Sequence, residues 1–575
     1  MSTRDPRFDF ETLTERALGG RMSRRELARR GAFSSAAAAA ARLGGAGSAG
    51  LGAGLGIRAV RAQEEPGGTI NVAQTGGDSS MGNPILVGGT DNYPFRWAFS
   101  RLIQYDDTGV IIPDLADEWS YDSSGTEVTF KLNPAALWHD GEPVTSEDVI
   151  FTFDTIKDEN TKTNRRSNLQ VGGEYINWAA PDAGTVVITT PEPFAPLLFS
   201  LSIIGIIPRH MLADVEDINT DPFNLSPIGS GPFRIVEWQQ NIVTRYERFE
   251  EYFRGPAAAE ALNEVFFENA APALASLEAG EVDVVFAPPE LQAPFEDHPD
   301  FLLLRYVYYT PITLSFNQKH PLLQDLTLRR AIELAIDKDS LDETLTKGRN
   351  SRTDNQYADS GPLDRYNDYS LPNAEFNVVV ANGILDDAGY TIGADGIRKK
   401  AGERLSFPML TYSGFEEYRN GLEILHEMLG AIGIETTPEV IDYSALAERW
   451  ADPEDDALTR PMTLEEYPHP FEQDPDVFDE LHSTNFPPGG NNYNYFADDQ
   501  VDELIEQGRT ETDEETRVGI YHQLDARRKE TIPAIPLYLA TDSWVFSRKV
   551  GGIPEDTPSS RWFLRCCIDQ LYKEE

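Results

Sequence analysis

The histidines and acidic residues are the side chains best suited to chemistry in this chain, and their spacing favours binding over catalysis. The eight histidines are scattered between His139 and His522, with no i, i+4 pair. His426-Glu427 lacks the second histidine of a zinc protease, and neither a G-x-S-x-G motif nor a Walker loop occurs. Acidic pairs are so frequent here that a pair of carboxylates is weak support for a glycosidase. We therefore expect no catalytic residues and no cofactor.

A metal site and a cysteine site are minor alternatives. His139, His469 and His482 could gather and bind a metal such as nickel, although we expect no metal. The two cysteines, Cys566 and Cys567, are adjacent, and neighbouring residues rarely adopt unstrained disulfide geometry. We interpret them as small, partly buried residues, with a strained vicinal disulfide or a reactive thiol as the alternative.

Length and charge limit the classes of protein that fit. A chain of 575 residues is too long for one compact core, so two or three domains are expected. The net charge of −46 disfavours binding to nucleic acid or to anionic lipid. A cationic or zwitterionic ligand would suit this charge, but a solvated acidic surface is the simpler interpretation.

Residues 1–62 have the order of an export signal. A twin-arginine core, Ser23-Arg24-Arg25-Glu26-Leu27, precedes a weakly apolar Ala/Gly tract over 32–56 and then the small-residue site Val60-Arg61-Ala62. We expect cleavage near Gln63 after export in a folded state, without a lipid anchor because no cysteine lies near that site. A plain Ala/Gly linker is the alternative. No run of 18 apolar residues follows residue 62, so no membrane span is predicted in the mature protein.

The segment 115–156 predicts a strand, a turn and a capped helix. Val128, Phe130 and Leu132 alternate with polar residues, as in a half-buried strand. Asp140-Gly141 indicates a tight turn, with Trp138 and His139 held beside it. Thr145 and Asp148 match a capping box, and the apolar residues that follow at helical spacing are Val149, Ile150, Phe153 and Ile156.

Further strands and helices are expected through the rest of the chain. Strands are expected at 69–73, 186–189, 282–286, 308–315 and 532–539. Helices are expected around 97–103, 272–280, 328–336, 381–388, 422–432, 501–505 and 518–524.

Several of these segments together resemble one family. Leu115-Ala116, Glu118-Trp119 and the run from Trp138 to Phe153 are similar to the signature of the peptide and nickel type of extracytoplasmic solute-binding protein, family 5. Further landmarks are Ile206–Met211, Ser226–Phe233, Ala273–Asp283, Ala381–Tyr390 and Tyr467–Phe478. Proteins of this family deliver ligands to ABC importers.

The resemblance implies a periplasmic-binding-protein type II fold, in which two α/β lobes enclose a ligand cleft and are joined by two hinge crossings. Lobe I would comprise residues 63–317, with an extra subdomain over about 106–230, and would be completed by residues 531–575. Lobe II would comprise residues 318–530. Discontinuity of lobe I follows from the resemblance, because no shift in composition marks it.

The resemblance also implies two ligand-binding segments. The loop that contains Gly89, Thr90, Asp91 and Tyr93 would offer backbone and hydroxyl groups to the ligand; a plain surface loop is the alternative.

In the landmark that begins at Tyr467, a carboxylate would accept the α-ammonium of a peptide through a charge-assisted hydrogen bond. Asp474 is the first candidate and Glu472 the second. His469 stands where an acid is common, and Asp474 could instead only initiate the turn before Pro475.

The resulting hypothesis is the substrate-binding component of an ABC importer, which binds a peptide by hinge closure. Its expected partners are the permease subunits, and we expect a monomer in the periplasm or at the extracytoplasmic face. Alternatives with the same fold are a binder of an oligosaccharide, an opine-like solute or a nickel chelate, and a sensor that signals to a membrane receptor. Sugar stacking on Trp97, Trp119, Trp178 or Trp450 would suit the first, although core packing is the simpler role. An exported hydrolase of peptides or glycans is the alternative of another class.

Overall fold

The fold is taken from a computed structural model. The residues that it describes are 67–75, 82–86, 97–106, 110–163, 165–359, 361–413, 416–442, 445–446, 449–450, 459–467, 474–487, 490–553 and 568–573. Residues 65–575 form one compact unit. The predicted export signal and the cysteine pair lie outside the described residues.

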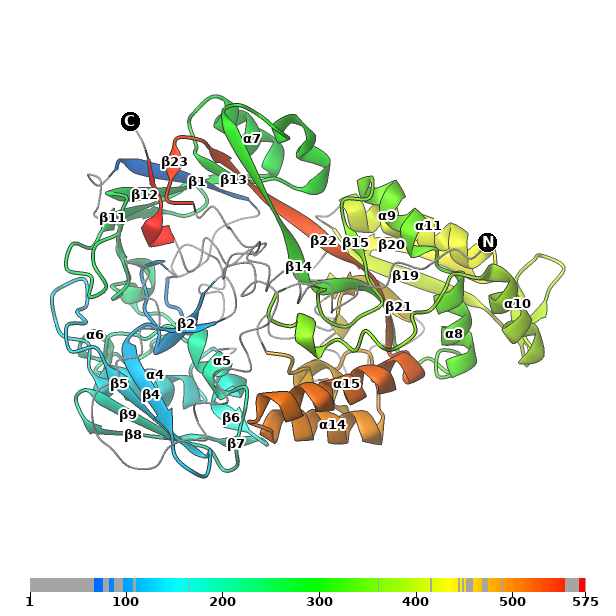
Figure 1. Ribbon diagram of the computed structural model, residues 1–575, viewed down its shortest axis with the longest axis horizontal. Coiled ribbons are helices and arrows are strands. Elements are labelled where there is room, and N and C mark those ends of the chain that lie inside the picture. Colours follow the sequence, from blue (N-terminus) through cyan, green and yellow to red (C-terminus); the bar gives the residue numbers. More distant parts are fainter. Residues whose placement is uncertain are drawn as a thin grey trace, which may run out of the picture. The chain divides into compact units, whose positions relative to one another are not determined.

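One large mixed sheet of 11 strands runs through the unit (Figure 1). Its order is β10-β11-β12-β1-β13-β22-β14-β21-β19-β20, with β15 paired to β22. The bounds are β10 Phe233–Gln239, β11 Val243–Arg248, β12 Ala261–Phe267, β1 Thr69–Thr75, β13 Val284–Phe286, β22 Ala534–Ser547, β14 Phe301–Phe316, β21 Met462–Glu466, β19 Ser406–Tyr412, β20 Glu435–Ile441 and β15 Ser351–Arg352.

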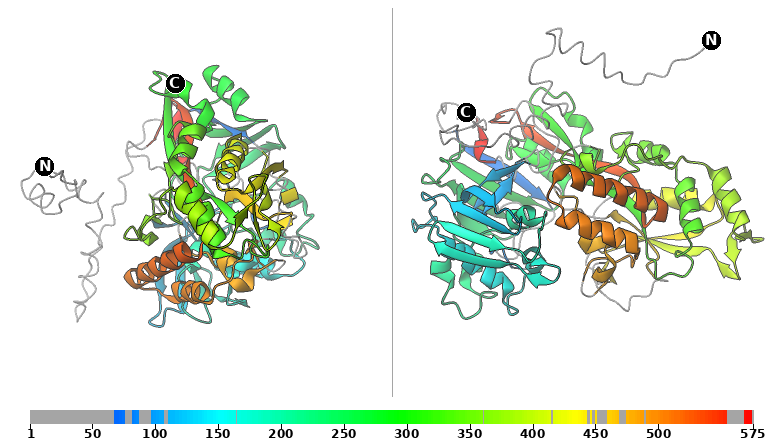
Figure 2. Two further views of the ribbon diagram at one scale, coloured as in Figure 1. Left: turned by 90° about the vertical axis from the view of Figure 1, so that its right-hand side faces the viewer. Right: turned by 60° about the horizontal axis from the view of Figure 1, so that its bottom comes forward.

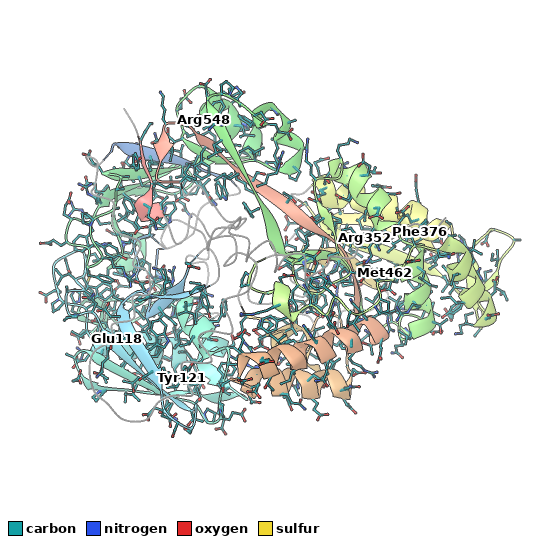
Figure 3. The ribbon with its side chains drawn as sticks, viewed as in Figure 1. Glu118, Tyr121, Arg352, Phe376, Met462 and Arg548 are labelled. Carbon is teal, nitrogen blue, oxygen red and sulfur yellow. The ribbon has the colours of Figure 1, made fainter. Side chains whose placement is uncertain are left out.

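The two longest strands, β14 and β22, join the two parts of this sheet. They are antiparallel, with register from Phe301 opposite Ser547 to Ser315 opposite Ala534. β13 pairs with the last part of β22, whereas β21 pairs with the last part of β14. Figure 3 shows Met462 on β21 and Arg352 on β15 beside these strands, in agreement with their pairing to β14 and β22. The chain therefore crosses between the two parts twice, as predicted, while the residue boundaries of the lobes stay a prediction.

A second sheet is formed by residues 116–189, within the predicted extra subdomain. It has four antiparallel strands in the order β4-β5-β9-β8, namely Ala116–Tyr121, Glu127–Leu132, Thr185–Thr189 and Asn177–Asp182. Helix α4 (Ser146–Lys157) packs against it, and Val128, Phe130, Val149 and Phe153 share one buried core.

The capping box of α4 is confirmed. The main-chain N–H of Thr145 donates to the Asp148 carboxylate at 2.8 Å, and the reciprocal contact is also present. Gly141 has φ +93°, a conformation that favours glycine, so the turn before the helix also forms as predicted.

Further helices lie between these strands in the sequence. They are α7 Ala270–Glu278, α8 Leu326–Ala335, α9 Lys338–Thr346, α10 Val378–Asp387, α11 Glu416–Gly430, α14 Asp499–Thr510 and α15 Glu514–Thr531. The predicted stripe Leu422, Leu425 and Leu429 is fully buried on α11. Helices α14 and α15 lie side by side (Figure 2). No helix among the described residues is both long enough and apolar enough to cross a membrane.

The prediction of a helix around 97–103 was wrong. This segment is irregular, and only Ile103–Tyr105 is regular, as strand β2. Its main chain bonds to distant groups: the N–H of Arg101 donates to the Asp114 carboxylate, and the N–H of Leu115 donates to the Arg101 carbonyl. Trp97 packs in one apolar cluster and Phe99 in another, so the segment passes between two cores and the helical spacing arose by chance.

The ends of the folded unit lie together. The N–H of Lys573 donates to the Gly67 carbonyl at 3.1 Å, and the short strands β23 (Val550–Gly551) and β24 (Tyr572–Lys573) pair beside β1. A side chain at position 67 would place its Cβ 2.6 Å from the Lys573 carbonyl oxygen, so only glycine allows this approach.

Candidate ligand-binding site

The predicted ligand segment after β21 lies at the junction of the two long strands and helices α14 and α15. Strand β21 ends at Glu466, which is opposite Ile312 of β14. The chain is described again from Asp474, and the segment to Val477 leads into the short helix α13 (Phe478–Leu481).

Asp474 forms a buried, bidentate ion pair with Arg517 of α15. Its Oδ1 and Oδ2 accept from the two terminal guanidinium nitrogens at 2.7 and 2.9 Å, and Oδ1 also accepts from the N–H of Asp476 at 3.0 Å. Arg517 is fixed further by donation from Nε to the Gly508 carbonyl at 2.8 Å. Burial alone would lower the pKa of Arg517, but the charge of Asp474 outweighs it and the pKa is raised. Both oxygens of Asp474 are thus committed to partners within the protein.

The other predicted site residues fall into two groups. Tyr467 is 3% exposed within an apolar cluster, and its hydroxyl donates to the Glu480 carbonyl at 2.8 Å. Glu472, Gly89, Thr90, Asp91 and Tyr93 lie outside the described residues. Tyr467 and Asp474 are both bonded to other groups of the protein, and the ligand-binding roles of all these residues stay predictions.

Glu466 is a carboxylate that the sequence reasoning did not single out. It is half-buried at the end of β21, and the buried Tyr418 hydroxyl donates to its Oε1 at 2.9 Å. Its neighbour Glu465 points to the opposite side of the strand and accepts from the Ser315 hydroxyl. The signal that could have identified it is its position directly before Tyr467-Pro468, where the family landmark begins.

A second ion pair connects the same segment to α14. Arg509 Nε lies 3.0 Å from Asp476 Oδ2, and both side chains are largely buried. Burial raises the pKa of the Asp476 carboxyl, and Arg509 opposes that rise. The Arg509 guanidinium also lies 3.9 Å from the centre of the Phe478 ring, a distance suited to a cation–π contact.

Residues from the N-terminal half of the chain approach these two ion pairs. The Arg509 guanidinium lies 5.1 Å from the Phe194 ring centre, and its main-chain carbonyl accepts from the N–H of Ala195 at 2.8 Å. Burial, and next the charge of Asp474, raise the pKa of Tyr105 on β2. Segments more than 300 residues apart in sequence therefore meet at Asp474 and Arg509.

The described histidines considered for a metal contact other groups of the protein. His139 Nε2 lies 3.0 Å from the Gly231 carbonyl, and its Nδ1 accepts from the N–H of Gly229 at 3.3 Å. His482 contacts Thr484 and Glu506, and His469 is outside the described residues. Across the described part of the chain, no three His, Cys, Asp or Glu side chains are grouped to hold a metal.

Comparison with known proteins gives consistent results at the level of sequence and of fold. The family model for bacterial extracellular solute-binding proteins, family 5, matches residues 110–499. The oligopeptide-binding protein AppA of Bacillus subtilis is 25% identical over 499 residues, which cover 83% of this chain and 89% of AppA.

Two solved structures show the same fold. The structure of AppA from B. subtilis with a nonapeptide has a TM-score of 0.74 and 22% identity, and covers 89% of this chain and all of that one. The structure of NikZ from Campylobacter jejuni with Ni(L-His) has a TM-score of 0.75 and 24% identity, and covers 88% of this chain and 99% of NikZ. The fold is thus that of the type II periplasmic binding proteins, in agreement with the sequence prediction.

Proposed function

The chain belongs to family 5 of the bacterial extracellular solute-binding proteins, and from this premise we propose that it delivers a peptide to an ABC importer. Its relatives are solute-binding proteins and not enzymes. The proposed action is capture: two lobes close over the ligand, and the closed form is recognised by the permease subunits. The observation that carries the proposal is the family match over residues 110–499 together with the two crossing strands.

Closure by bending of β14 and β22 is supported by their form. Each runs through both parts of the large sheet, and their register is irregular between Val307 and Pro311 and between Ile312 and Thr313. Irregular pairing weakens the ladder locally, which is where a change of backbone angles costs least. The contacts of Arg509 with Phe194 and Ala195 are then contacts of the closed form.

For the ligand's α-ammonium we propose a carboxylate of the segment 466–474. Glu466 joins the predicted Asp474 and Glu472 as a candidate. Because Asp474 already accepts two hydrogen bonds from Arg517, it would have to share that pair with a ligand. Glu466 lies at the end of β21, directly before the landmark, and accepts from the Tyr418 hydroxyl. The loop that contains Gly89, Thr90, Asp91 and Tyr93 would bind the peptide main chain.

We further propose export by the twin-arginine route, with a mature N-terminus near Gln63, and a monomer without a cofactor in the periplasm or at the extracytoplasmic face. N-terminal sequencing of exported protein tests the cleavage site, since material that still begins at Met1 contradicts it.

Titration calorimetry with short peptides tests the function. We expect heat for at least one peptide and none for its N-acetylated form, because acetylation removes the ammonium that the carboxylate would bind. The Glu466→Gln variant should lose at least about tenfold in affinity, as expected for the loss of a charge-assisted hydrogen bond. Glu439→Gln, which changes an acid on β20, is the matched control.

Two outcomes would contradict the proposal. Heat with a nickel chelate, an opine or an oligosaccharide, and none with any peptide, would place the chain among binders of those solutes. Mass spectrometry of the peptide after release should return it intact, whereas cleaved peptide would make the protein a hydrolase.

A further inference from the structure

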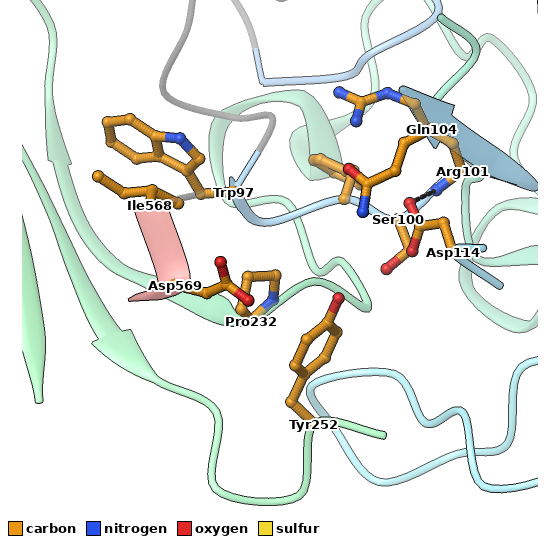
Figure 4. Close-up of a pocket in the computed structure, with 10 residues that line it drawn as sticks. Trp97, Ser100, Arg101, Gln104, Asp114, Pro232, Tyr252, Ile568 and Asp569 are labelled. Atoms are coloured by element: carbon orange, nitrogen blue, oxygen red, sulfur yellow. Dashed lines mark hydrogen bonds between the residues drawn. The ribbon is translucent and has the colours of Figure 1, made fainter. Parts of the chain in front are cut away.

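A small pocket beside the C-terminal segment suits water and not a solute. Its walls include Arg101, Asp114, Tyr252 and Asp569 (Figure 4), and it has room for about two water molecules. The Asp114 carboxylate accepts from the main-chain N–H of Arg101 at 2.8 Å, and the charges of Arg254 and Arg101 oppose the rise that burial causes in its pKa. The pocket therefore provides no further binding site.

Strand β22 changes its partner along one edge. Its residues 544–546 pair with β13, whereas its residues 538–539 pair with β15, which comes from a different part of the sequence (Figure 1). Between these two pairings, no strand from the described part of the chain pairs with residues 540–543 on this edge. Residues 540–543 are called the interrupted stretch below.

The opposite edge of β22 is irregular at an overlapping position. There β14 runs along the whole strand, but the register shifts between Val307, which is opposite Thr541, and Pro311, which is opposite Leu539. Interrupted ladders resist bending least. The interrupted stretch is therefore where we expect the two parts of the large sheet to rotate when the lobes close, as proposed above.

Side chains replace strand pairing at the interrupted stretch. The main-chain N–H of Thr541 donates to Asn350 Oδ1 at 2.9 Å, and the Thr541 hydroxyl donates to the Arg349 carbonyl at 3.0 Å. Asn350 Nδ2 donates in turn to Glu417 Oε1 at 2.9 Å. Arg349 and Asn350, which directly precede β15, are thereby fixed to β22.

The Arg349 side chain reaches from this position to the segment that follows β13. Its Nη1 donates to the main-chain carbonyl of Pro289, at the start of the short helix η5 (Pro289–Leu291), at 2.5 Å. Ala287, between β13 and η5, is fixed to the other end of the interrupted stretch, because its N–H donates to the Ser543 carbonyl at 2.8 Å. The Arg349 guanidinium therefore connects the chain beside β15 with the chain beside β13.

A second contact of Arg349 is weaker. Its Nη2 lies 4.0 Å from Glu296 Oε1, and the same oxygen pairs with Arg305 of β14 at 2.5 Å. The Glu296 side chain is 44% exposed, so water screens this charge pair. The bond to the Pro289 carbonyl is therefore the contact that fixes the Arg349 side chain.

We propose that Arg349 is a positioning residue for ligand capture, because its hydrogen bond to Pro289 stabilises the closed form of the protein. The two residues lie on either side of the interrupted stretch, so rotation of one part against the other changes their distance, and a hydrogen bond is strong only within a narrow range of distance and angle. The bond is present together with the contact of Arg509 and Phe194, a contact of the closed form as proposed above. This role rests on the proposed function, since it requires an open and a closed form.

The rates of peptide binding, measured by stopped-flow fluorescence with a peptide that binds the parent chain, test this role. Arg349→Met keeps the apolar stem but removes the donors. It should raise the dissociation rate about three- to tenfold and change the association rate less than about twofold, because the lost bond exists only in the closed form. Arg349→Lys keeps the charge and a flexible donor and should show a smaller increase. Arg245→Met, which breaks an exposed pair with Glu237 on β11, is the matched control and should keep both rates.

Hydrogen exchange of the ligand-free chain is a second test that needs no ligand. Arg349→Met should speed exchange at the Thr541 N–H about threefold or more, because its acceptor Asn350 is no longer held through the neighbouring side chain. Exchange in the hairpin of β10 and β11 should stay the same. If no solute binds the parent chain, the proposed function fails, and exchange at Thr541 alone decides the role of Arg349.

Three results would overturn this role. Equal dissociation rates in the parent chain and Arg349→Met would mean that the bond does not favour the closed form, and slower dissociation would mean that it favours the open form. Equal exchange at Thr541 in the two chains would mean that the bond does not form in solution. Should Arg349→Met not fold, Arg349→Gln, whose amide is too short to reach Pro289, is compared in its place.

Discussion

At the scale of single residues, the pair of Asp474 and Arg517 decides what the predicted site can do. The sequence indicated Asp474 through the landmark around it, but its partner stands 43 residues further along. Nothing in the local sequence shows that a helix will bring a guanidinium to both carboxylate oxygens. A prediction of the acid was therefore possible, whereas a prediction of its charge environment required the fold.

Asp474→Asn should lower the free energy of unfolding by about 3 to 5 kcal/mol, because it leaves Arg517 charged, buried and without its counter-ion. Urea unfolding followed by circular dichroism measures this. Glu416→Gln breaks the exposed pair with Arg419 and should cost less than about 1 kcal/mol. A loss at Asp474 as small as that of the control would show that the pair is solvated in solution.

His139 predicts a dependence of stability on pH. Burial lowers its pKa to about 4 from the ordinary 6.5. Between these values the unfolded chain binds more protons than the folded chain, so this contribution is complete above about pH 6.5 and is lost as the pH falls towards 4. The loss at pH 5 should be about 2 kcal/mol.

Urea unfolding at pH 5 and pH 7.5 measures this loss of unfolding free energy. Comparing the loss in the parent chain with that in His139→Gln separates the contribution of the histidine from that of the buried acids. We expect the variant to be less sensitive to acid than the parent. Equal sensitivity of the two chains would mean that the ring titrates normally in the folded state.

At the scale of elements, local rules worked where the segment satisfies its own hydrogen bonds. The prediction of a strand, a turn and a capped helix over 115–156 was correct because Thr145 and Asp148 bond each other and the apolar residues of the helix face one core. The helix prediction for 97–103 was wrong because the main chain of this segment bonds to Asp114 and to Leu115, and its apolar residues pack into different cores. Spacing cannot distinguish one core from two.

The contact of the Phe194 segment with α14 gives a prediction about ligand affinity. Phe194→Leu keeps an apolar side chain but removes the ring face near the Arg509 guanidinium, worth about 0.5 to 1 kcal/mol. If that contact forms only on closure, peptide affinity should fall about two- to fivefold, and the urea midpoint should also fall somewhat because Phe194 is buried in an apolar cluster. Calorimetry measures the affinity, and Phe151→Leu on α4 is the control. Unchanged affinity would mean that the contact does not favour the closed form.

At the scale of the whole unit, the type of fold followed from landmarks spread along the chain, and the large sheet agrees with it. The position of the ligand within the fold did not follow, because the sequences of the predicted site loop and of the landmark from Tyr467 show no periodicity that would place their side chains. The order of the strands shows why the two parts of the large sheet are coupled. Strand β13 pairs with β22 and strand β21 pairs with β14, so bending of the two long strands moves the strands on either side of them.

Small-angle scattering should show a smaller radius of gyration with a saturating peptide than without it, because the closure proposed above brings the lobes together. The N-acetylated peptide, which should not bind, is the control. Identical scattering curves with a peptide that calorimetry shows to bind would mean that capture occurs without a change of shape.

The close approach of Gly67 and Lys573 has a consequence for engineering. Since the first and last strands of the unit are neighbours, a linker of a few residues could join them, and new termini could be cut at an exposed turn such as the one around Gly402. Such a circular permutant would keep every strand pairing of the large sheet. It would also allow reporter domains to be attached at a chosen turn while the order of β14 and β22 in space stays the same.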